Sequence, residues 1–434
     1  MRSSAIGIFA CTVSALFATE AATGEAETGA RAAAEIAATG QLPTGPAAGD
    51  MELSPFYRWT AGMPDKPGHL LRKEPVSGQQ EPASASQTLR ILYTSMDARW
   101  RSGPIPVSGT LYLPAGTPPA GGWPVIAWGH GTLGIADVCA PSWTGFKPRD
   151  AAYINRWLDA GFAVVATDYQ GLGGPGPHPY LYWQAEGRSI LDSVRAVSAA
   201  APGLLSSHVV IAGQSQGAGA ALGAALLLRE YAPELRILGI VATAPNSTFP
   251  DGPVSLPVRN SPNMFLSVVT VGLRDEGVKV EDILSEKGKR LLETARRGCT
   301  REIGMEARKL EVGSLADAFS IPLDELAAIR INATDMPMKT VGVPLLIATG
   351  LADATVEPER QYAVVSALCA ADNEVIWRRY EGLGHGETLH GSFEDSVAFA
   401  RTLLQGEKVA GNCSEASAPG PLQQRDPHAP FNGD

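Results

Sequence analysis

The sequence predicts an α/β protein in which helices cover both faces of a mostly parallel sheet and a helical cap interrupts the later part of that sheet. Short, wholly apolar runs such as residues 123–128 (WPVIAW) are typical of strands buried on both faces. Helical segments separate these runs along most of the chain, and this alternation indicates βαβ units. Hydrophobic residues make up 44% of the 434 residues, which is ample for a large core.

The expected elements follow one another in a regular order. Residues 88–96 and 105–113 alternate polar and apolar side chains, so we expect two strands that pair with each other. Further strands are expected at 123–128, 162–167, 208–212, 236–244, 343–349 and 374–380. Helices are expected at 151–160, 188–200, 216–231, 359–371 and 393–404.

One long segment, residues 245–338, breaks this order. It contains amphipathic stretches, and we expect residues 280–297 to form one of its helices. A structureless loop of this length is uncommon inside a compact domain, so we expect a helical cap, or lid, with a separate docking domain as the alternative. The chain then divides into a signal peptide (1–22), a loose N-terminal segment (23–50), a core (51–244 and 339–410), the cap (245–338) and a disordered tail (411–434).

Charge and hydropathy exclude two classes of function. The formal net charge of -10 disfavours binding to the phosphates of nucleic acids. After the N-terminus no apolar run is long enough to span a membrane, which leaves only transient contact with a lipid surface.

The first residues are typical of an export signal. Arg2 is followed by an apolar run at 5–17 and by small residues at 18–22, and we expect cleavage near Ala21 or Ala22. The alternatives are a buried core helix and a lipoprotein anchor at Cys11, although the apolar run before Cys11 is short for an anchor. We therefore expect a secreted protein, extracellular or periplasmic.

Four cysteines remain once Cys11 leaves with the signal, and an even number in an oxidising compartment predicts two disulfides. Of the three possible connectivities we favour Cys139–Cys299 and Cys369–Cys413, because the last two lie close in sequence around the final helix. Four free buried thiols are the alternative. No Cys/His spacing matches a zinc site, so neither a metal nor an organic cofactor is expected.

The motif that carries the chemistry is GQSQG at residues 213–217, between the strand 208–212 and the helix 216–231. In the α/β-hydrolase fold, a sharp strand-to-helix turn of the form G-x-S-x-G exposes a nucleophilic serine. The helix also points its N-terminal N–H groups at this spot, where negative charge would develop. We therefore predict that Ser215 is the nucleophile; a purely structural turn is the alternative.

The base that this serine requires is expected among the seven histidines. His385 lies in a Gly-rich loop directly after the last strand, and the chain order Ser, acid, His is the one this fold uses. His390 is a rival, but it lies near the start of the last helix. His178 follows a Gly/Pro loop that could face the pocket, yet for it, as for His69, His208 and His428, we expect an ordinary polar or packing role.

The acid of the site is expected after the strand 343–349, where GLADATV offers Asp353. Its carboxylate would orient the imidazole and stabilise the imidazolium. Glu357 and Glu359 are alternatives, but they are typical of acids in the first turn of the next helix, where the helix dipole favours them.

The loop GHGT at residues 129–132 follows the strand 123–128 and is expected to complete an oxyanion hole. The donors would be the backbone N–H groups of Thr132 and of Gln216, next to the nucleophile. We expect a structural role for His130 rather than that of a second base. Residues expected to line the pocket are His130, Gly131, Tyr169 and Gln214.

Several motifs agree in order with one known family: WPVIAWGHGTLGIADVCAPS, ATDYQGLGGPGPHPYL, AGQSQGAGAAL, GLADATV and GLGH. Together they make residues 53–404 resemble the secretory lipase family of capped α/β-hydrolases. The resemblance implies a secreted lipase or esterase with a helical lid and with a triad on Ser215, Asp353 and His385. The GHGT loop is similar to the bacterial branch, whereas the fungal lipases have an acidic side chain at the oxyanion position. A carboxylesterase for smaller or unusual esters therefore fits as well as a lipase that degrades lipids.

The sequence thus predicts hydrolysis of small-molecule or lipid esters through an acyl-enzyme on Ser215, with His385 as base. A lactonase, an amidase or an acyltransferase would use the same triad, so these remain alternatives. A non-catalytic secreted binding protein of the same fold is a further alternative.

Overall fold

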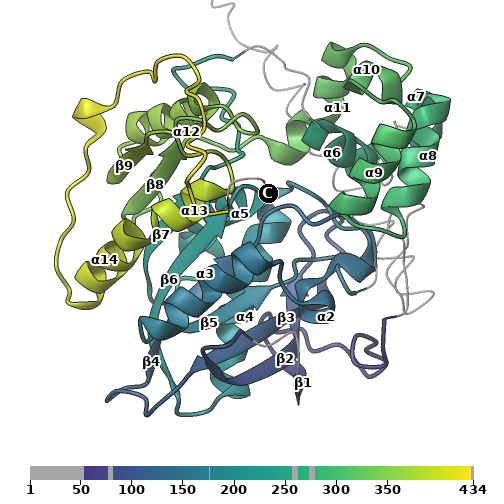
Figure 1. Ribbon diagram of the computed structural model, residues 1–434. Coiled ribbons are helices and arrows are strands. Elements are labelled where there is room, and N and C mark those ends of the chain that lie inside the picture. The colour runs from purple at the N-terminus through teal and green to yellow at the C-terminus, as the bar shows by residue number, and fades with distance from the viewer. Residues whose placement is uncertain (1–52, 77–81, 175, 257–261, 273–278, 432–434) are drawn as a thin grey trace, which may run out of the picture.

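The structure is a computed structural model that describes residues 53–76, 82–174, 176–256, 262–272 and 279–431. Nine strands form one sheet in the order β1-β2-β3-β5-β4-β6-β7-β8-β9, and helices cover both of its faces (Figure 1). The expected signal peptide and loose N-terminal segment lie outside the described residues.

The first edge of the sheet is antiparallel. It consists of β1 (Leu70–Pro75), β2 (Ala85–Met96) and β3 (Pro104–Pro114). The predicted pairing of the second and third strands is confirmed, with Ile91 opposite Gly109 and Tyr93 opposite Val107.

The rest of the sheet is parallel, which confirms the predicted fold class. It contains β4 (Trp123–Gly129), β5 (Ala163–Thr167), β6 (Leu205–Gln214), β7 (Ile237–Thr243), β8 (Leu345–Gly350) and β9 (Val375–Tyr380). Side chains alternate between the two faces, so the apolar β4 supplies Val125 and Ala127 to one core and Ile126 and Trp128 to the other.

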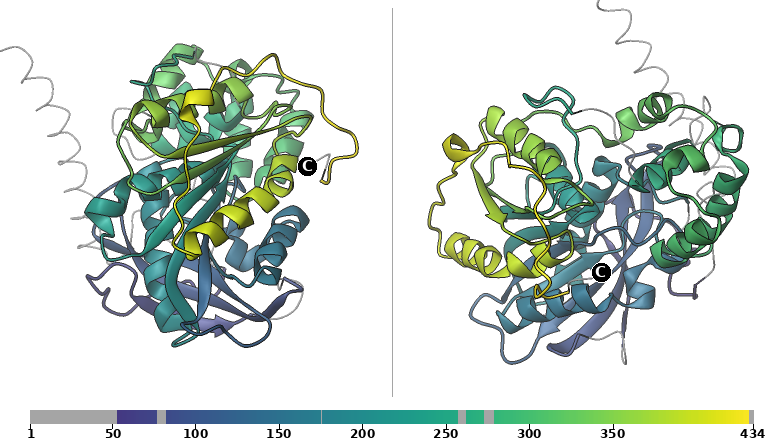
Figure 2. Two further views of the ribbon diagram at one scale, coloured as in Figure 1. Left: turned by 90° about the vertical axis from the view of Figure 1, so that its left-hand side faces the viewer. Right: turned by 45° about the horizontal axis from the view of Figure 1, so that its top comes forward.

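Each face of the sheet packs against its own helices. One core joins the sheet to α4 (Trp183–Ala200), α5 (Gln216–Tyr231) and α12 (Pro358–Ala370). The opposite core joins it to α3 (Pro148–Asp159), α13 (Glu387–Gly391) and α14 (Phe393–Leu404), and Figure 2 shows this division from two further sides. Short helices η1 (Asp137–Cys139) and α2 (Pro141–Thr144) follow β4.

Within the part of the chain that the structure describes, six helices lie between β7 and β8 and gather beside the sheet (Figure 1). They are α6 (Pro262–Gly272), α7 (Val280–Ile283), α8 (Glu286–Ala295), α9 (Thr300–Lys309), α10 (Leu315–Ala318) and α11 (Leu323–Thr334). We call this group the cap. Its buried side chains form a cluster of their own, which Ile135, Tyr180 and Leu181 from the core also join.

The expected single helix over 280–297 is wrong. This stretch instead contains two helices, α7 and α8, because Leu284 adopts an extended backbone. Ser285 then starts α8 as its N-cap, accepting a hydrogen bond from Gly288 N–H at 3.1 Å. A serine hydroxyl that satisfies an unpaired helix N–H favours this new start over continuation of the first helix.

The expectation of a disordered tail is also wrong for the described residues up to 431. After η2 (Cys413–Glu415) the chain runs back over the sheet edge, where Gln423 N–H donates to Leu351 O at 2.9 Å and Asp426 N–H donates to Gly382 O at 2.8 Å. The polar composition of the tail predicted disorder, but composition does not reveal hydrogen bonds between backbone groups that are distant in sequence.

Both favoured disulfides are present, Cys139–Cys299 and Cys369–Cys413, so the predicted pairing is confirmed. Cys139 lies in η1 of the core and Cys299 caps α9, so the first disulfide joins core and cap. A backbone bond from Thr300 N–H to Leu133 O, 2.8 Å, lies beside it. Among the described helices, none is both long and apolar enough to cross a bilayer.

Candidate active site

Ser215 lies in a tight turn between β6 and α5. Its backbone has φ 58° and ψ -117°, a conformation that residues other than glycine rarely adopt. The turn requires glycine on both sides, because a Cβ on Gly213 would overlap Gly217 O and a Cβ on Gly217 would overlap Gly129 O. Ser215 N–H donates to Thr243 O at 2.9 Å, which fixes the turn against β7. This is the geometry that a G-x-S-x-G nucleophile elbow requires.

Asp353 and His385, which lie in loops after β8 and β9, come together at the same edge of the sheet. His385 Nδ1 lies 2.8 Å from Asp353 Oδ2. Asp353 is fully buried, and its Oδ1 accepts hydrogen bonds from Thr355 N–H and Val356 N–H at 2.9 Å each. Gln361 on α12 donates a further bond to Oδ2 at 2.9 Å. Four donors thus hold this carboxylate in one orientation.

The loop that carries His385 is tied to the residue before Ser215. Gln214 Nε2 donates to His385 O at 3.2 Å. Because a carboxylate can only accept, His385 Nδ1 must carry the proton of the bond to Asp353. The Nε2 atom of a neutral His385 is then the basic one, and the side chain is 18% exposed.

The rival residues have other surroundings. His390 lies on α13, where its Nε2 atom faces Arg149 O at 2.9 Å and its ring stacks on Phe431. Burial lowers the pKa of His390. Glu357 is the N-cap residue of α12 and Glu359 lies in its first turn, so both stand where the helix dipole favours a negative charge.

The GHGT loop passes directly beside the turn at Ser215. A Cβ built on Gly131 would lie 3.7 Å from Ser215 Cβ and 2.7 Å from Gln214 Oε1, so a larger residue would displace Gln214. Thr132 follows, and its Oγ1 lies 2.7 Å from Tyr180 Oη. Gln216 is the first residue of α5, and the first N–H groups of a helix have no acceptor within the helix.

Of the residues expected along the pocket, His130, Tyr169 and Gln214 are all buried. His130 Nδ1 lies 2.7 Å from Gly131 O, and Tyr169 Oη donates to His130 O at 3.0 Å. Burial lowers the pKa of His130. A neutral ring bonded to the loop backbone supports the loop's shape. Both ring nitrogens face a carbonyl, and the shorter contact, from Nδ1 to Gly131 O, favours Nδ1 over Nε2, which lies 3.4 Å from Asp168 O, as the protonated atom.

A cavity of about 490 Å³ extends from Thr132 into the cap. Its lining is mostly apolar and comes from α6, α8, α9, α10 and the turn between α9 and α10: Phe265, Leu266, Leu291, Thr300, Ile303, Gly304, Ala307, Val312, Gly313, Ser314, Leu315 and Ala318. This volume is in the usual range for a small-molecule site. Across the described residues, no group of three His, Cys, Asp or Glu side chains could hold a metal.

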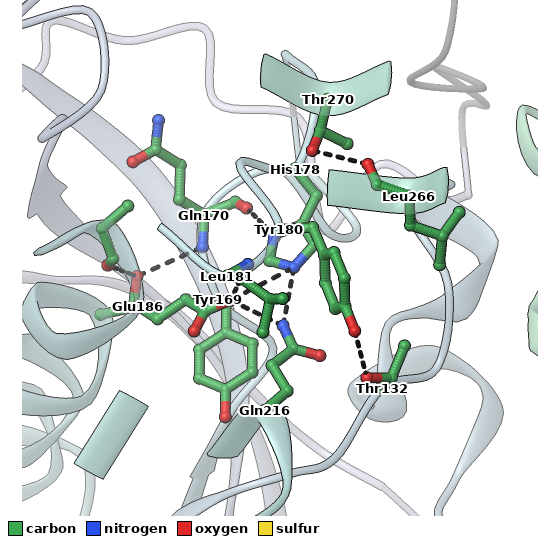
Figure 3. A network of polar contacts seen from close by, with 12 residues as sticks. Thr132, Tyr169, Gln170, His178, Tyr180, Leu181, Glu186, Gln216, Leu266 and Thr270 are labelled. Carbon is green, nitrogen blue, oxygen red and sulfur yellow. Dashed lines mark hydrogen bonds and ion pairs between the residues drawn. The ribbon is translucent and has the colours of Figure 1, made fainter. Parts of the chain in front are cut away.

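Two residues near Ser215 have surroundings that the sequence did not predict: Glu186 was not considered, and His178 was expected to be an ordinary polar or packing residue. His178 and Glu186 are fully buried and both contact the side chain of Gln216 (Figure 3). The helix was expected only from residue 188, whereas α4 begins at Trp183, so Glu186 lay outside the expected helix. The available signal was the spacing of Trp183, Glu186 and Ile190, which places Glu186 on the apolar face once the helix is extended. A carboxylate at such a position is buried and requires a partner.

Comparison with known proteins is consistent with this geometry. A family model described as "Secretory lipase" matches residues 144–372, just over half of the chain. Lipase A of Moesziomyces aphidis is 35% identical over 112 residues, an alignment that covers 23% of each protein. The chain thus matches less than a quarter of that relative's length.

Solved structures with the same fold include lipases and esterases. The closed state of Candida antarctica lipase A has a TM-score of 0.66 and 19% identity, covering 86% of this chain and 89% of that one. The rice cell wall degrading esterase LipA from Xanthomonas oryzae has a TM-score of 0.60 and 17% identity, covering 79% of this chain and 100% of that one. These likenesses establish the α/β-hydrolase fold. Because they include fungal and bacterial proteins, membership of the bacterial branch stays a prediction.

Proposed function

This chain belongs to the secretory lipase family, and on that premise we propose that it is a secreted serine hydrolase that cleaves carboxylic esters. The observation that carries the proposal is the convergence at one sheet edge of the strained turn at Ser215 with the bonded pair Asp353–His385. The bond from Gln214 to His385 O supports their proximity, because it links the two loops directly.

In the proposed mechanism His385 Nε2 accepts the proton of Ser215 Oγ as Oγ forms a bond to the ester carbonyl carbon. The N–H groups of Thr132 and Gln216 donate to the oxyanion. The carbon–alkoxide bond then breaks, and His385 gives its proton to the departing alcohol. A water molecule attacks the acyl-enzyme with His385 again as base, which releases the acid and frees Ser215.

The acyl group would occupy the cap cavity. Thr132 is both a proposed oxyanion donor and part of the cavity lining, so a carbonyl held there would point one substituent toward the apolar side chains of the cap. A neutral apolar substituent would bury its surface without leaving polar groups unpaired. The proposal therefore favours esters of apolar acids over esters of charged acids.

The test is ester hydrolysis by the purified secreted protein, with a fluorophosphonate probe that labels activated serines. The wild-type protein should hydrolyse p-nitrophenyl esters and be labelled, and Ser215→Ala should lose both properties. Labelling that survives in Ser215→Ala would refute the nucleophile. Failure of the folded wild-type protein to react with esters or the probe would refute the enzyme proposal in favour of a binding protein.

The base is tested with a matched pair of histidines five residues apart. His385→Gln should lower kcat by about 10³-fold or more, whereas His390→Gln should leave kcat within about threefold. Parallel assays with lactones and amides separate an esterase from a lactonase or an amidase, and product analysis with added alcohols detects acyl transfer.

A further inference from the structure

The side chain of Gln216 is held in a buried polar cluster behind the proposed oxyanion hole. Its Nε2 atom lies 2.7 Å from Glu186 Oε1 and 3.0 Å from His178 Nε2, as Figure 3 shows. All three side chains are almost completely shielded from solvent. The backbone N–H of the same Gln216 is the proposed donor to the oxyanion, so one residue connects the cluster to the reacting atoms.

The hydrogen positions in the cluster follow from its geometry. His178 Nδ1 lies 2.7 Å from Gln170 O, and because a carbonyl only accepts, Nδ1 carries the proton. The Nε2 atom of His178 is then a lone-pair acceptor, and burial lowers the pKa of His178 to about 3, which keeps the ring neutral. The amide of Gln216 has two hydrogens, and one goes to His178 while the other goes to Glu186.

The frame behind the cluster is closely packed. Glu186 Oε1 also accepts from Leu181 N–H at 2.9 Å, so the carboxyl group is held from two sides. One residue further along α4, a Cβ on Gly187 would lie 2.7 Å from Ala224 N, so α4 and α5 meet there with backbone against backbone. The cluster therefore links α4 directly to the first residue of α5.

We propose that Glu186 and His178 are positioning residues that fix the side chain of Gln216 and thereby aim its backbone N–H at the oxyanion. The inference rests on the proposed ester hydrolysis at Ser215. The N–H of Gln216 has no acceptor within the helix, and its direction is that of the planar peptide it shares with Ser215. Ser215 O accepts from Ala218 N–H at 3.0 Å and Gly219 N–H at 3.2 Å, which holds this peptide on its carbonyl side. A donor stabilises the oxyanion only when it is preorganised at about 3 Å from it. The two bonds to the Gln216 side chain restrain the same peptide from its Gln216 side and so add to that preorganisation.

Loss of the restraint should slow the chemical step more than it weakens substrate binding. Removal of a whole oxyanion donor typically lowers kcat by about 10²–10³-fold, so a donor that is present but loosely held should cost about 10–100-fold. KM should change little, because the cap cavity and not the cluster contacts the acyl group. A merely structural role would lower stability and leave kcat of the folded protein unchanged.

The first experiment compares two substitutions of Glu186 with a control on the same helix. Glu186→Gln keeps an oxygen that accepts from Leu181 and Gln216, so its kcat should stay within about threefold of wild type. Glu186→Leu should lower kcat by about 10–100-fold with KM within about threefold. In the control, Asp192→Asn, a buried carboxylate bonded to Ser95, Tyr231 and Arg195 is neutralised. That variant should lose stability and keep its kcat.

A double-mutant cycle then tests whether Glu186 acts through Gln216. Gln216→Met keeps the backbone N–H and loses both side-chain bonds, and it should lower kcat by about 10–100-fold. The double variant Glu186→Leu, Gln216→Met should be no slower than Gln216→Met alone. The proposal would be overturned if the double variant lowered kcat by the product of the two single effects. It would also be overturned by a folded Gln216→Met variant with kcat within threefold of wild type. That second outcome decides the matter even if Glu186→Leu does not fold.

The outcome for this inference is distinct from the outcome for the proposed function. If the wild-type protein neither hydrolyses esters nor reacts with the fluorophosphonate probe, the proposed function fails. If the wild-type protein is active and Gln216→Met is equally active, only the positioning role of the cluster fails.

Discussion

The turn at Ser215 in the core and the lining of the cap cavity differ in how tightly their glycines are confined. In the core, glycines 213 and 217 leave no room for even one additional carbon, and four donors hold Asp353 in place. In the cap, two glycines of the cavity lining, Gly304 and Gly313, have no atom closer than 3.8 Å to an added Cβ. Under the proposed function, reactive geometry and substrate volume are set in separate regions, so substitutions should affect kcat in one and substrate choice in the other.

The largest expected effect tests the core. Asp353→Asn should lower kcat by about 10⁴-fold, because the amide allows the wrong histidine tautomer and does not stabilise the imidazolium. Glu357→Gln, four residues further along, should stay within about threefold of wild type. Steady-state kinetics with a p-nitrophenyl ester measure both. A comparable loss in Glu357→Gln would move the acid to the rival position.

The joint between the two regions is tested with the disulfides. The Cys139–Cys299 bond closes a separation of 160 residues and the Cys369–Cys413 bond one of 44, so replacing each pair by serine should cost about 5 and about 4 kcal/mol of unfolding free energy in the chain-entropy account. Denaturant unfolding measures these losses. Only removal of the first pair should also raise KM for apolar esters, since it alone joins core and cap. Equal KM changes would contradict that distinction.

A buried carboxyl group in the core, that of Glu186, predicts a pH dependence of stability. Burial raises the pKa of Glu186 from 4.5 to about 8, so the folded state binds this proton more tightly than the unfolded state does. The corresponding stability is fully present below pH 4.5 and is lost as the pH rises through about 8. Between pH 4.5 and 9, the unfolding free energy of the wild-type protein should therefore fall by roughly 4 kcal/mol more than that of Glu186→Gln.

Denaturant unfolding of the two proteins at several pH values measures that difference. Parallel stability curves would show that Glu186 does not keep its proton in the folded state. His178 gives the opposite slope at lower pH, because burial lowers its pKa to about 3 and its stability contribution is lost as the pH falls below 6.5.

The smallest expected effect tests the cap, with two adjacent leucines of α8. Leu291 lines the cavity, whereas Leu292 is buried in the cap away from it. Leu291→Trp should lower kcat/KM for a long-chain ester by about 10-fold and leave an acetate ester within about twofold. Leu292→Trp, like Leu291→Trp, should lower the unfolding free energy by about 1–3 kcal/mol through overpacking. It should leave the ratio of kcat/KM for the two esters unchanged. An unchanged ratio in Leu291→Trp would place the acyl group elsewhere.

Much of the core followed from local patterns. The apolar runs predicted the parallel strands because a strand buried on two faces has no polar side, and α5 and α14 begin and end as expected. The cap was less predictable. Its helices are short and depend on local capping, so Ser285 divided a stretch whose periodicity indicated one helix. The tail was misjudged because its anchors are backbone contacts to Leu351 and Gly382 from distant parts of the chain.

The sequence by itself determined the alternating fold and the glycine-flanked turn at Ser215, because each depends on residue type at short spacing. It favoured one of three disulfide connectivities, and the structure confirms that one. Only the tertiary structure decided which residues surround that turn. Asp353 and His385 meet because neighbouring parallel strands end at one edge, and Glu186 and His178 reach Gln216 because α4 packs directly on α5. The volume above Thr132 likewise exists only once the cap helices have packed, since no local pattern encodes the space between them.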